Sequence, residues 1–109
     1  GYTTEFEMKE TKPEIVNESG NGLSNRWMTV GMARSSEPHT ASSQFYINLV
    51  DNVSLDPMPT RWGYAVFGEV ISGFEVVAAI GQSATQTFQD LQDVPVAPII
   101  ILEAKKTGL

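Results

Sequence analysis

The chain has 109 residues, of which 41% are hydrophobic and 18% charged, and this composition fits one globular domain rather than a disordered chain. Its formal net charge of −6 argues against nucleic acid and anionic membranes as partners, because phosphate groups attract basic surfaces. The chain has no cysteine, which excludes disulfides and thiol nucleophiles, and its single histidine excludes a histidine metal cage. No apolar run approaches the ~18 residues that a membrane span needs.

The first 26 residues are polar, and we expect irregular structure there with little core of its own. Five glutamates stand against three basic residues in this segment. Pro13 and the run Gly20-Asn21-Gly22 are turn formers. A short extended piece is expected around Ile15 and Val16.

The next part of the chain favours two strands separated by a loop. We expect the first strand at 27–34, where small or polar residues interrupt the apolar ones. The second, at 44–50, is rich in aromatic and β-branched residues. Between them, 35–43 consists almost entirely of turn formers, and a second loop is expected at 51–61.

A third strand is expected at 64–71, followed by a short helix. Phe74, Val77 and Ala78 are spaced i, i+3, i+4, which indicates a helix packed on a sheet, and Gly81 is its expected end.

The remainder is predicted to be a long polar loop at 82–95 and a last strand at 96–105. Pro98 lies near the start of that strand, where its missing N–H matters least. The expected total is four strands and one helix. Long connections, rather than tight two-residue hairpins, leave the pairing order open.

Residues 32–48, with the sequence MARSSEPHTASSQFYIN, resemble the signature of the cyclophilin family, particularly its bacterial form. Residues 62–70 resemble the family's next core strand, and 73–80 resemble the helix after it, in the right order and at the right distances. The resemblance extends over essentially the whole chain. A motif of 17 positions with correctly ordered neighbours is far more specific than a lone short pattern.

The resemblance implies a mainly β fold. The family fold is an eight-stranded antiparallel barrel closed by two helices, and this chain resembles its later strands and one helix. We therefore expect residues 1–109 to be a single cyclophilin-like domain lacking the family's N-terminal part, which carries the catalytic arginine. An open barrel exposes unpaired strand edges, so we expect the chain to associate with that N-terminal half or with a second copy.

The activity implied is peptidyl-prolyl cis-trans isomerisation, which assists protein folding, with proline-containing peptides or unfolded protein segments as partners. Rotation about a peptide bond is hindered by about 18–20 kcal/mol. A catalyst must bind the twisted amide better than either planar form. That requires a hydrophobic slot, hydrogen bonds to the flanking backbone and a donor aimed at the prolyl nitrogen, but no cofactor and no metal.

The strand at 44–50 carries the central site residues. Gln44 and Tyr46 share one face of the strand, while Phe45 and Ile47 are expected to point into the core. By resemblance, Gln44 helps to orient the catalytic arginine, and Tyr46 lines the proline slot. The family typically has phenylalanine at Tyr46, so the added hydroxyl must find water or a partner.

The other site assignments also come from the resemblance. Leu55 and Tyr64 complete the slot. Ser54 stands where many eukaryotic members carry a tryptophan important for cyclosporin, so we expect weak cyclosporin binding. The substrate-binding residues are therefore expected to be Ala33, Arg34, Ser35, Thr40, Tyr46, Ser54, Leu55 and Tyr64.

The remaining polar candidates have an ordinary interpretation. His39 is read as a loop residue without a role, and a mixed site of His39 with carboxylates has little support. Asp56 and the other acidic loop residues are read as solvated charges.

Three functions stay open: an isomerase, a proline-peptide-binding or chaperone-like module, and an inactive fragment that needs its N-terminal half. Cyclophilins of bacteria occur in the cytoplasm and the periplasm, and residues 94–106 resemble the periplasmic type slightly more closely.

Overall fold

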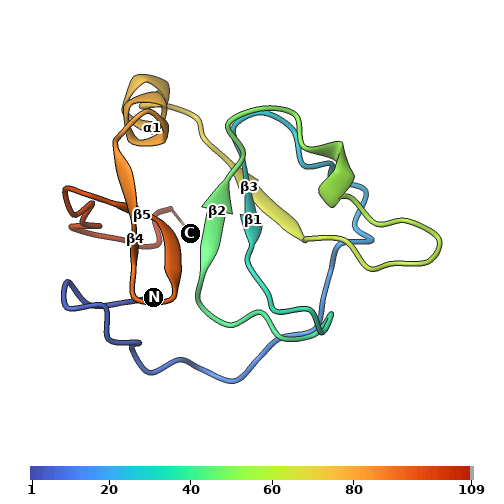
Figure 1. Ribbon diagram of the computed structural model, residues 1–109. Helices are drawn as coiled ribbons and strands as arrows, with labels where there is room; N and C mark the ends of the chain where they lie inside the picture. The colour runs from blue at the N-terminus through green and yellow to red at the C-terminus, as the bar shows by residue number, and fades with distance from the viewer. Residues whose placement is uncertain (109) are drawn as a thin grey trace.

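The computed structural model describes residues 1–108, which form mostly strands with one α-helix (Figure 1). No helix among these residues is long and apolar enough to cross a membrane. In chain order, the elements are β1 (Thr29–Met32), β2 (Phe45–Ile47), the 3-10 helix η1 (Val53–Leu55), β3 (Val66–Glu69), α1 (Phe74–Gly81), β4 (Thr85–Phe88) and β5 (Leu91–Pro95).

The first three strands form an antiparallel sheet in the order β2-β1-β3. They confirm the three predicted strands at shorter lengths. Val30 faces Ile47 and Gly31 faces Tyr46 across the β1–β2 ladder. The β1–β3 ladder shifts register between Val30 and Gly31, which indicates a bulge beside the sheet centre.

The N-terminal segment is irregular, as predicted, and has only isolated bridges. Ile15 bridges to Ala41, which confirms the short extended piece. The expectation of little core needs correction, because this segment contributes buried polar side chains at Asn17, Ser19 and Asn25. These side chains hydrogen-bond to loops far away in the sequence, as a buried amide must.

The helix α1 begins and ends close to the predicted positions, but it does not lie on a sheet face. The Phe74 ring at its start stacks on Trp27 with centroids 5.6 Å apart. A side chain on Gly81 at its end would come within 2.7 Å of Leu49. Trp27 precedes β1 and Leu49 follows β2, so the helix contacts the ends of the three-stranded sheet.

The C-terminal predictions are wrong in two places. The expected loop at 82–95 contains the antiparallel hairpin β4–β5, in which Phe88 pairs with Leu91 across a two-residue turn. The expected strand at 96–105 is absent from the described residues, although its sequence is apolar and β-branched. Strand propensity forms no ladder without a neighbouring strand, and Leu102 there is 93% exposed.

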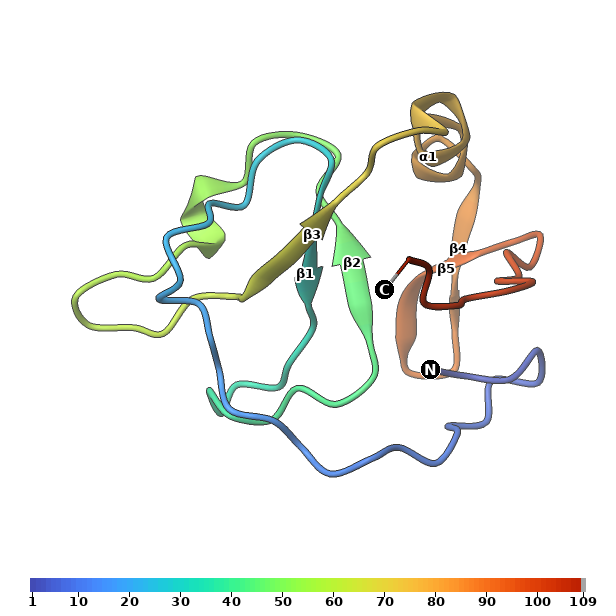
Figure 2. The same cartoon turned by 180° about the vertical axis from the view of Figure 1, so that it is seen from behind.

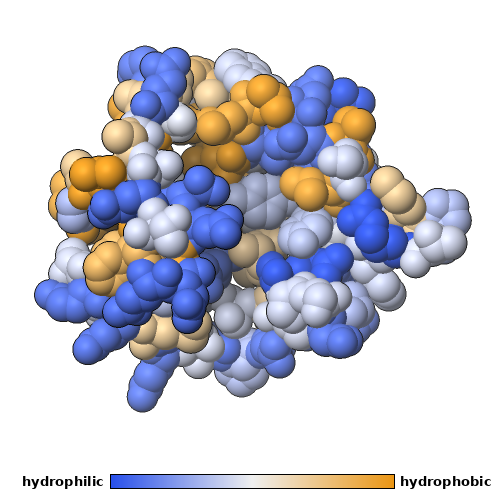
Figure 3. Space-filling model, viewed as in Figure 1, coloured by the Kyte–Doolittle hydropathy of each residue, from blue (hydrophilic) through white to orange (hydrophobic). Residues whose placement is uncertain are grey.

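The described chain leaves much of its apolar surface open. Its accessible surface is 8442 Å², against about 6,000 Å² for a folded monomer of this mass. The two sheets make no strand-to-strand contact with each other, and they lie apart in both ribbon views (Figures 1 and 2). Hydrophobic side chains flank a hollow near the centre of one face (Figure 3). The buried hydrophobic residues are Met28, Ala41, Val66 and Val94.

Candidate functional site

The predicted slot residues Tyr46 and Tyr64 lie together beside the three-stranded sheet. Their rings meet edge to face, with centroids 6.2 Å apart and an interplanar angle of 76°. The backbone N–H of Tyr64 donates to the carbonyl of Leu55 at 2.8 Å, which fixes the third slot residue next to the pair. The three residues that were expected to form the slot are therefore brought together.

The Tyr46 ring lies across Gly31, its partner in the β1–β2 ladder. A side-chain carbon on Gly31 would be 2.3 Å from Cζ of Tyr46. Only glycine leaves room for the ring at this position. On the other face of β2, Phe45 is 49% exposed, so the expectation that Phe45 points into a core does not hold among the described residues.

The hydroxyl of Tyr46 has the protein partner that its polarity requires. It donates to Oδ1 of Asn25 at 2.5 Å. Burial, with smaller contributions from Tyr64 and Asp56, raises the pKa of Tyr46 to about 12. The phenol therefore stays protonated, and is a hydrogen-bond donor, throughout the neutral range.

Arg34 clamps the two loops that border the slot. Its guanidinium lies over the Tyr64 ring, with Cζ 4.4 Å from the centroid. Nη2 donates to the carbonyl of Trp62 at 3.0 Å and Nη1 to that of Ser35 at 2.9 Å. The sequence analysis expected Arg34 to bind substrate and did not predict this contact of its side chain with the loops.

The remaining predicted residues fall into separate pairs. The N–H of Ala33 donates to the carbonyl of Gln44 at 3.0 Å, and the Gln44 side chain is exposed. The hydroxyls of Ser35 and Thr40 are 2.8 Å apart. Ser54, in η1, belongs to neither pair: it is exposed, and its carbonyl accepts a hydrogen bond from Arg61.

Asp56 is bound into the fold rather than solvated, which corrects the sequence interpretation. Its carboxylate accepts hydrogen bonds from the Ser24 hydroxyl and from the backbone N–H of Asn25, the latter at 2.8 Å. Burial acts to raise the pKa of Asp56, but the hydrogen bonds from Ser24 and Asn25, helped by Arg26, hold it below its usual value.

A second cluster of buried polar groups joins the segment 17–19 to the loops around Pro38 and Gly63, and Nε of Arg34 also donates to the carbonyl of Gly63, at 3.3 Å. The side-chain amide of Asn17 donates to the carbonyls of Pro38 at 3.0 Å and Gly63 at 2.9 Å. The N–H of Gly63 donates to the Ser19 hydroxyl at 3.1 Å. Sequence reasoning missed this cluster, although a loop rich in asparagine and serine is a signal for side chains that bond to backbone.

His39, which is exposed, borders this cluster, and it was expected to be a loop residue without a role. Its Nδ1 accepts the backbone N–H of Asn17 at 3.0 Å, and its ring meets Trp62 edge to face at 4.8 Å. The histidine therefore packs the loop, and the described residues hold no cluster of acidic and histidine side chains suited to a metal.

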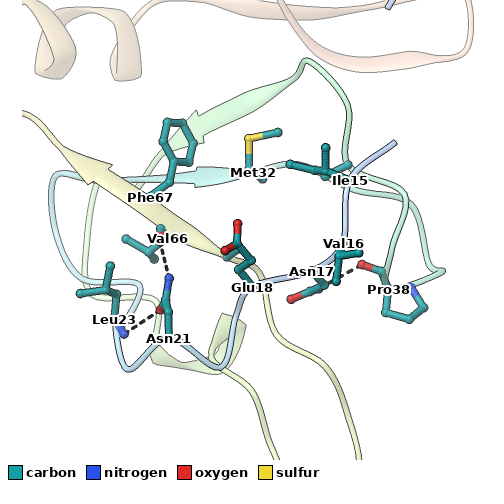
Figure 4. Close-up of a pocket in the computed structure, with 12 residues that line it drawn as sticks. Ile15, Val16, Asn17, Glu18, Asn21, Leu23, Met32, Pro38, Val66 and Phe67 are labelled. Carbon is teal, nitrogen blue, oxygen red and sulfur yellow. Dashed lines mark hydrogen bonds between the residues drawn. The ribbon is translucent and has the colours of Figure 1, made fainter. Parts of the chain in front are cut away.

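A cavity lies elsewhere in the molecule. It measures about 460 Å³ and lies between the segment 15–23 and the sheet, with Ile15, Met32 and Phe67 on its apolar walls (Figure 4). None of the predicted site residues lines it. Phe67 is 57% exposed, so this wall of the cavity is not covered by other described residues.

Comparisons with known proteins agree with the sequence resemblance. A family model described as "Cyclophilin type peptidyl-prolyl cis-trans isomerase/CLD" matches residues 1–106. The chain is 46% identical to "Peptidyl-prolyl cis-trans isomerase cyp18" of Streptomyces antibioticus, over 99% of this chain and 67% of that protein. It is 45% identical to "Peptidyl-prolyl cis-trans isomerase A" of Dickeya dadantii, over 96% and 55%.

A third relative, "Peptidyl-prolyl cis-trans isomerase B" of Escherichia coli, is 43% identical, with 93% of this chain and 63% of that protein covered. The chain thus spans between 55% and 67% of the length of these three bacterial relatives. The match runs through the signature, the strand β3 and the helix α1 on which the resemblance was based. The chain belongs to the cyclophilin-type peptidyl-prolyl cis-trans isomerase family.

Proposed function

We propose that this chain forms the substrate-anchoring side of a peptidyl-prolyl cis-trans isomerase that acts on X–Pro bonds in extended or unfolded protein segments. The observation that carries the proposal is the edge-to-face pair of Tyr46, at the centre of β2, and Tyr64, which precedes β3, in a family of such isomerases. Aromatic faces suit the flat, apolar proline ring.

The surroundings of this pair are stiff, which favours tight discrimination between planar and twisted amides. Arg34 fixes the loop after β1 to the loop before β3, and Leu55 is tied to Tyr64 through the backbone. A rigid slot can hold the proline ring while the preceding residue rotates. Binding of the twisted form in preference to the planar forms is what accelerates exchange.

The arginine that would face the prolyl nitrogen is proposed to come from outside the described residues. The chain has three arginines. The guanidinium of Arg34 is occupied by Tyr64 and loop carbonyls, and Arg61 donates to the carbonyls of Ser54 and Asp56. Arg26 pairs with Asp51 at 3.8 Å, on the outer surface.

Exchange spectroscopy on a proline peptide tests the proposal. We expect the full chain, together with an added N-terminal portion of a bacterial relative, to accelerate cis/trans exchange. Tyr64→Ala should abolish the acceleration, and Tyr2→Ala, which changes a tyrosine in the N-terminal segment, should leave it intact. Equal exchange rates with and without the protein would contradict the isomerase.

The second candidate is a proline-peptide-binding module without turnover. The engagement of Arg34 and Arg61 by loop carbonyls, together with the place of Arg26 on the outer surface, favours it for the chain alone. Chemical-shift changes near Gln44 and Tyr46 on titration with a proline peptide, without isomer exchange, would support this module. Their absence would exclude it.

The partner proposed for the open apolar surface is a segment that completes the barrel. The accessible area of 8442 Å² exceeds the expectation for a monomer by more than the roughly 1,600 Å² of a standard interface. Sedimentation distinguishes the candidates: a second copy would double the mass, whereas an N-terminal segment of a relative would bind as a 1:1 complex.

Two smaller proposals complete the functional picture. Ser54 offers no aromatic surface, so cyclosporin is expected to bind weakly, and a submicromolar dissociation constant would contradict this. A location in the bacterial periplasm rests only on the resemblance of residues 94–106, and cell fractionation tests it.

A further inference from the structure

Asn25 is a buried amide with four side-chain hydrogen bonds beneath the aromatic pair. The residue is 0% exposed, and every polar atom of its side chain has a partner. Its Nδ2 donates to Asp56 Oδ1 at 3.0 Å and to the carbonyl of Tyr64 at 3.1 Å. Its Oδ1 accepts from the Tyr46 hydroxyl at 2.5 Å and from Nδ2 of Asn48 at 3.1 Å.

The chemistry of these partners fixes the orientation of the amide. The Asp56 carboxylate and the Tyr64 carbonyl can only accept, so the NH₂ group of Asn25 must face them. The Oδ1 atom must then face Tyr46 and Asn48. Asp56 is itself held by the Ser24 hydroxyl and by the backbone N–H of Asn25.

This orientation decides what the Tyr46 hydroxyl can do. Facing an oxygen that can only accept, the hydroxyl must donate inward, away from solvent. The same hydrogen bond holds the ring across Gly31 and edge-on to Tyr64. Without Asn25, the hydroxyl would need water or another partner at the rim of the slot, which would make an apolar slot polar.

We propose that Asn25, oriented by Asp56, is a positioning residue that draws the Tyr46 hydroxyl inward, so that the slot presents an aromatic ring without a free donor. The inference rests on the proposed function, because it concerns how that slot receives a proline ring. It explains how a tyrosine can serve as a wall for an apolar ring. It also predicts that removing Asn25 weakens peptide binding only when residue 46 carries a hydroxyl.

The test is a double-mutant cycle in the full chain, with the dissociation constant of a proline peptide as the readout. Tyr46→Phe supplies the second background of the cycle, in which the ring is kept while both the donor and its need for an acceptor are absent. Asn25→Ala should weaken binding about tenfold, because the hydroxyl loses its acceptor. Combining Tyr46→Phe with Asn25→Ala should restore most of the affinity that Asn25→Ala alone loses.

A matched control separates positioning from general stability. Asn52 donates to Oδ1 of Asn48 at 2.9 Å, in the same network but without touching Tyr46. Any loss caused by Asn52→Ala should not be rescued by Tyr46→Phe. If Asn25→Ala does not fold, as judged by circular dichroism, Asp56→Asn takes its place and should show the same rescue at smaller amplitude.

A second readout needs no peptide. The Gly31 Hα resonance reports the ring current of Tyr46, so it should move toward its random-coil position in Asn25→Ala and return in the double variant. Equal losses from Asn25→Ala in the tyrosine and phenylalanine backgrounds, in either readout, would overturn the inference. If the wild-type chain bound no proline peptide, the proposed function would fail while the Gly31 resonance still tested the positioning role.

Discussion

The sheet region 17–70 and the C-terminal segment 71–108 are stabilised in different ways. In the first, buried amides and hydroxyls tie loops together, as Asn25 and Asn17 do. In the second, Val94 is the buried hydrophobic residue, and the apolar run 99–102 is exposed. A polar network is satisfied by hydrogen-bond partners within its own region. An apolar strand is stabilised only when another surface packs against it and buries it. The region with the aromatic pair is therefore internally supported, whereas the run 99–102 has no packing surface among the described residues.

The largest effect is expected from closing the space at Gly63. A side-chain carbon there would lie 2.4 Å from the backbone nitrogen of Pro57, and backbone cannot yield as a side chain does. Gly63→Ala should lower the free energy of unfolding by about 3 kcal/mol. Gly68→Ala, in the same sheet region with open space around it, should be neutral or slightly stabilising. Urea unfolding followed by tryptophan fluorescence measures both, and equal values would show that the loops are not tightly joined.

A smaller effect is expected from removing the charge of Asp56. Hydrogen bonds to a carboxylate are stronger than neutral ones, so Asp56→Asn should cost about 1.5 kcal/mol at pH 7. Because the folded-state pKa lies below its usual value, this stabilisation is fully present above about pH 4 and is lost as the pH falls through the folded-state pKa.

Acid unfolding therefore tests the same residue in another way. The stability of the wild-type chain should decrease more steeply below pH 4 than that of Asp56→Asn. Asp51→Asn is the control, because the Asp51 side chain is 58% exposed, its pair with Arg26 lies at the surface, and the bond that its Oδ1 accepts from the backbone N–H of Trp27 can also be accepted by an asparagine oxygen. Parallel pH profiles of wild type and Asp56→Asn would contradict the role of the carboxylate.

The contact between the two regions should contribute less. Phe74 stacks on Trp27, so Phe74→Ala should cost about 1 kcal/mol and loosen α1. Hydrogen exchange should increase in α1 while protection of β1 is preserved. Val76→Ala, an exposed change on the same helix, should leave exchange unaltered. A loss of protection that extended equally into β1 would mean that the two regions unfold as one.

The smallest effect on stability is expected at Leu102, which is 93% exposed. Leu102→Lys should change the free energy of unfolding by less than about 0.5 kcal/mol. It should instead reduce association with a barrel-completing segment, measured by sedimentation. Val94→Ala, in the buried position of the same segment, should cost clearly more. A large cost at Leu102 would show that the C-terminal run is packed rather than open.

The signature at 32–48 indicated the family correctly, and the site residues are predictions that follow from that resemblance. It also contains β2 and Tyr46, because aromatic and β-branched residues have strand propensity. Local sequence likewise predicted α1 and its end at Gly81. These features depend on neighbours in the chain, so one sequence was enough to predict them.

Only the tertiary structure decided the rest. The polar run Thr85–Phe88 forms a strand because β5 lies beside it and pairs with it. Residues 96–105 form no strand because no described strand lies beside them. Asn25 could not be recognised from sequence, since its importance comes from Asp56, Tyr64 and Tyr46, which lie between 21 and 39 residues away. Hydrogen bonds over such distances depend on how the chain folds back on itself, and that information resides in the packing of loops rather than in any local pattern.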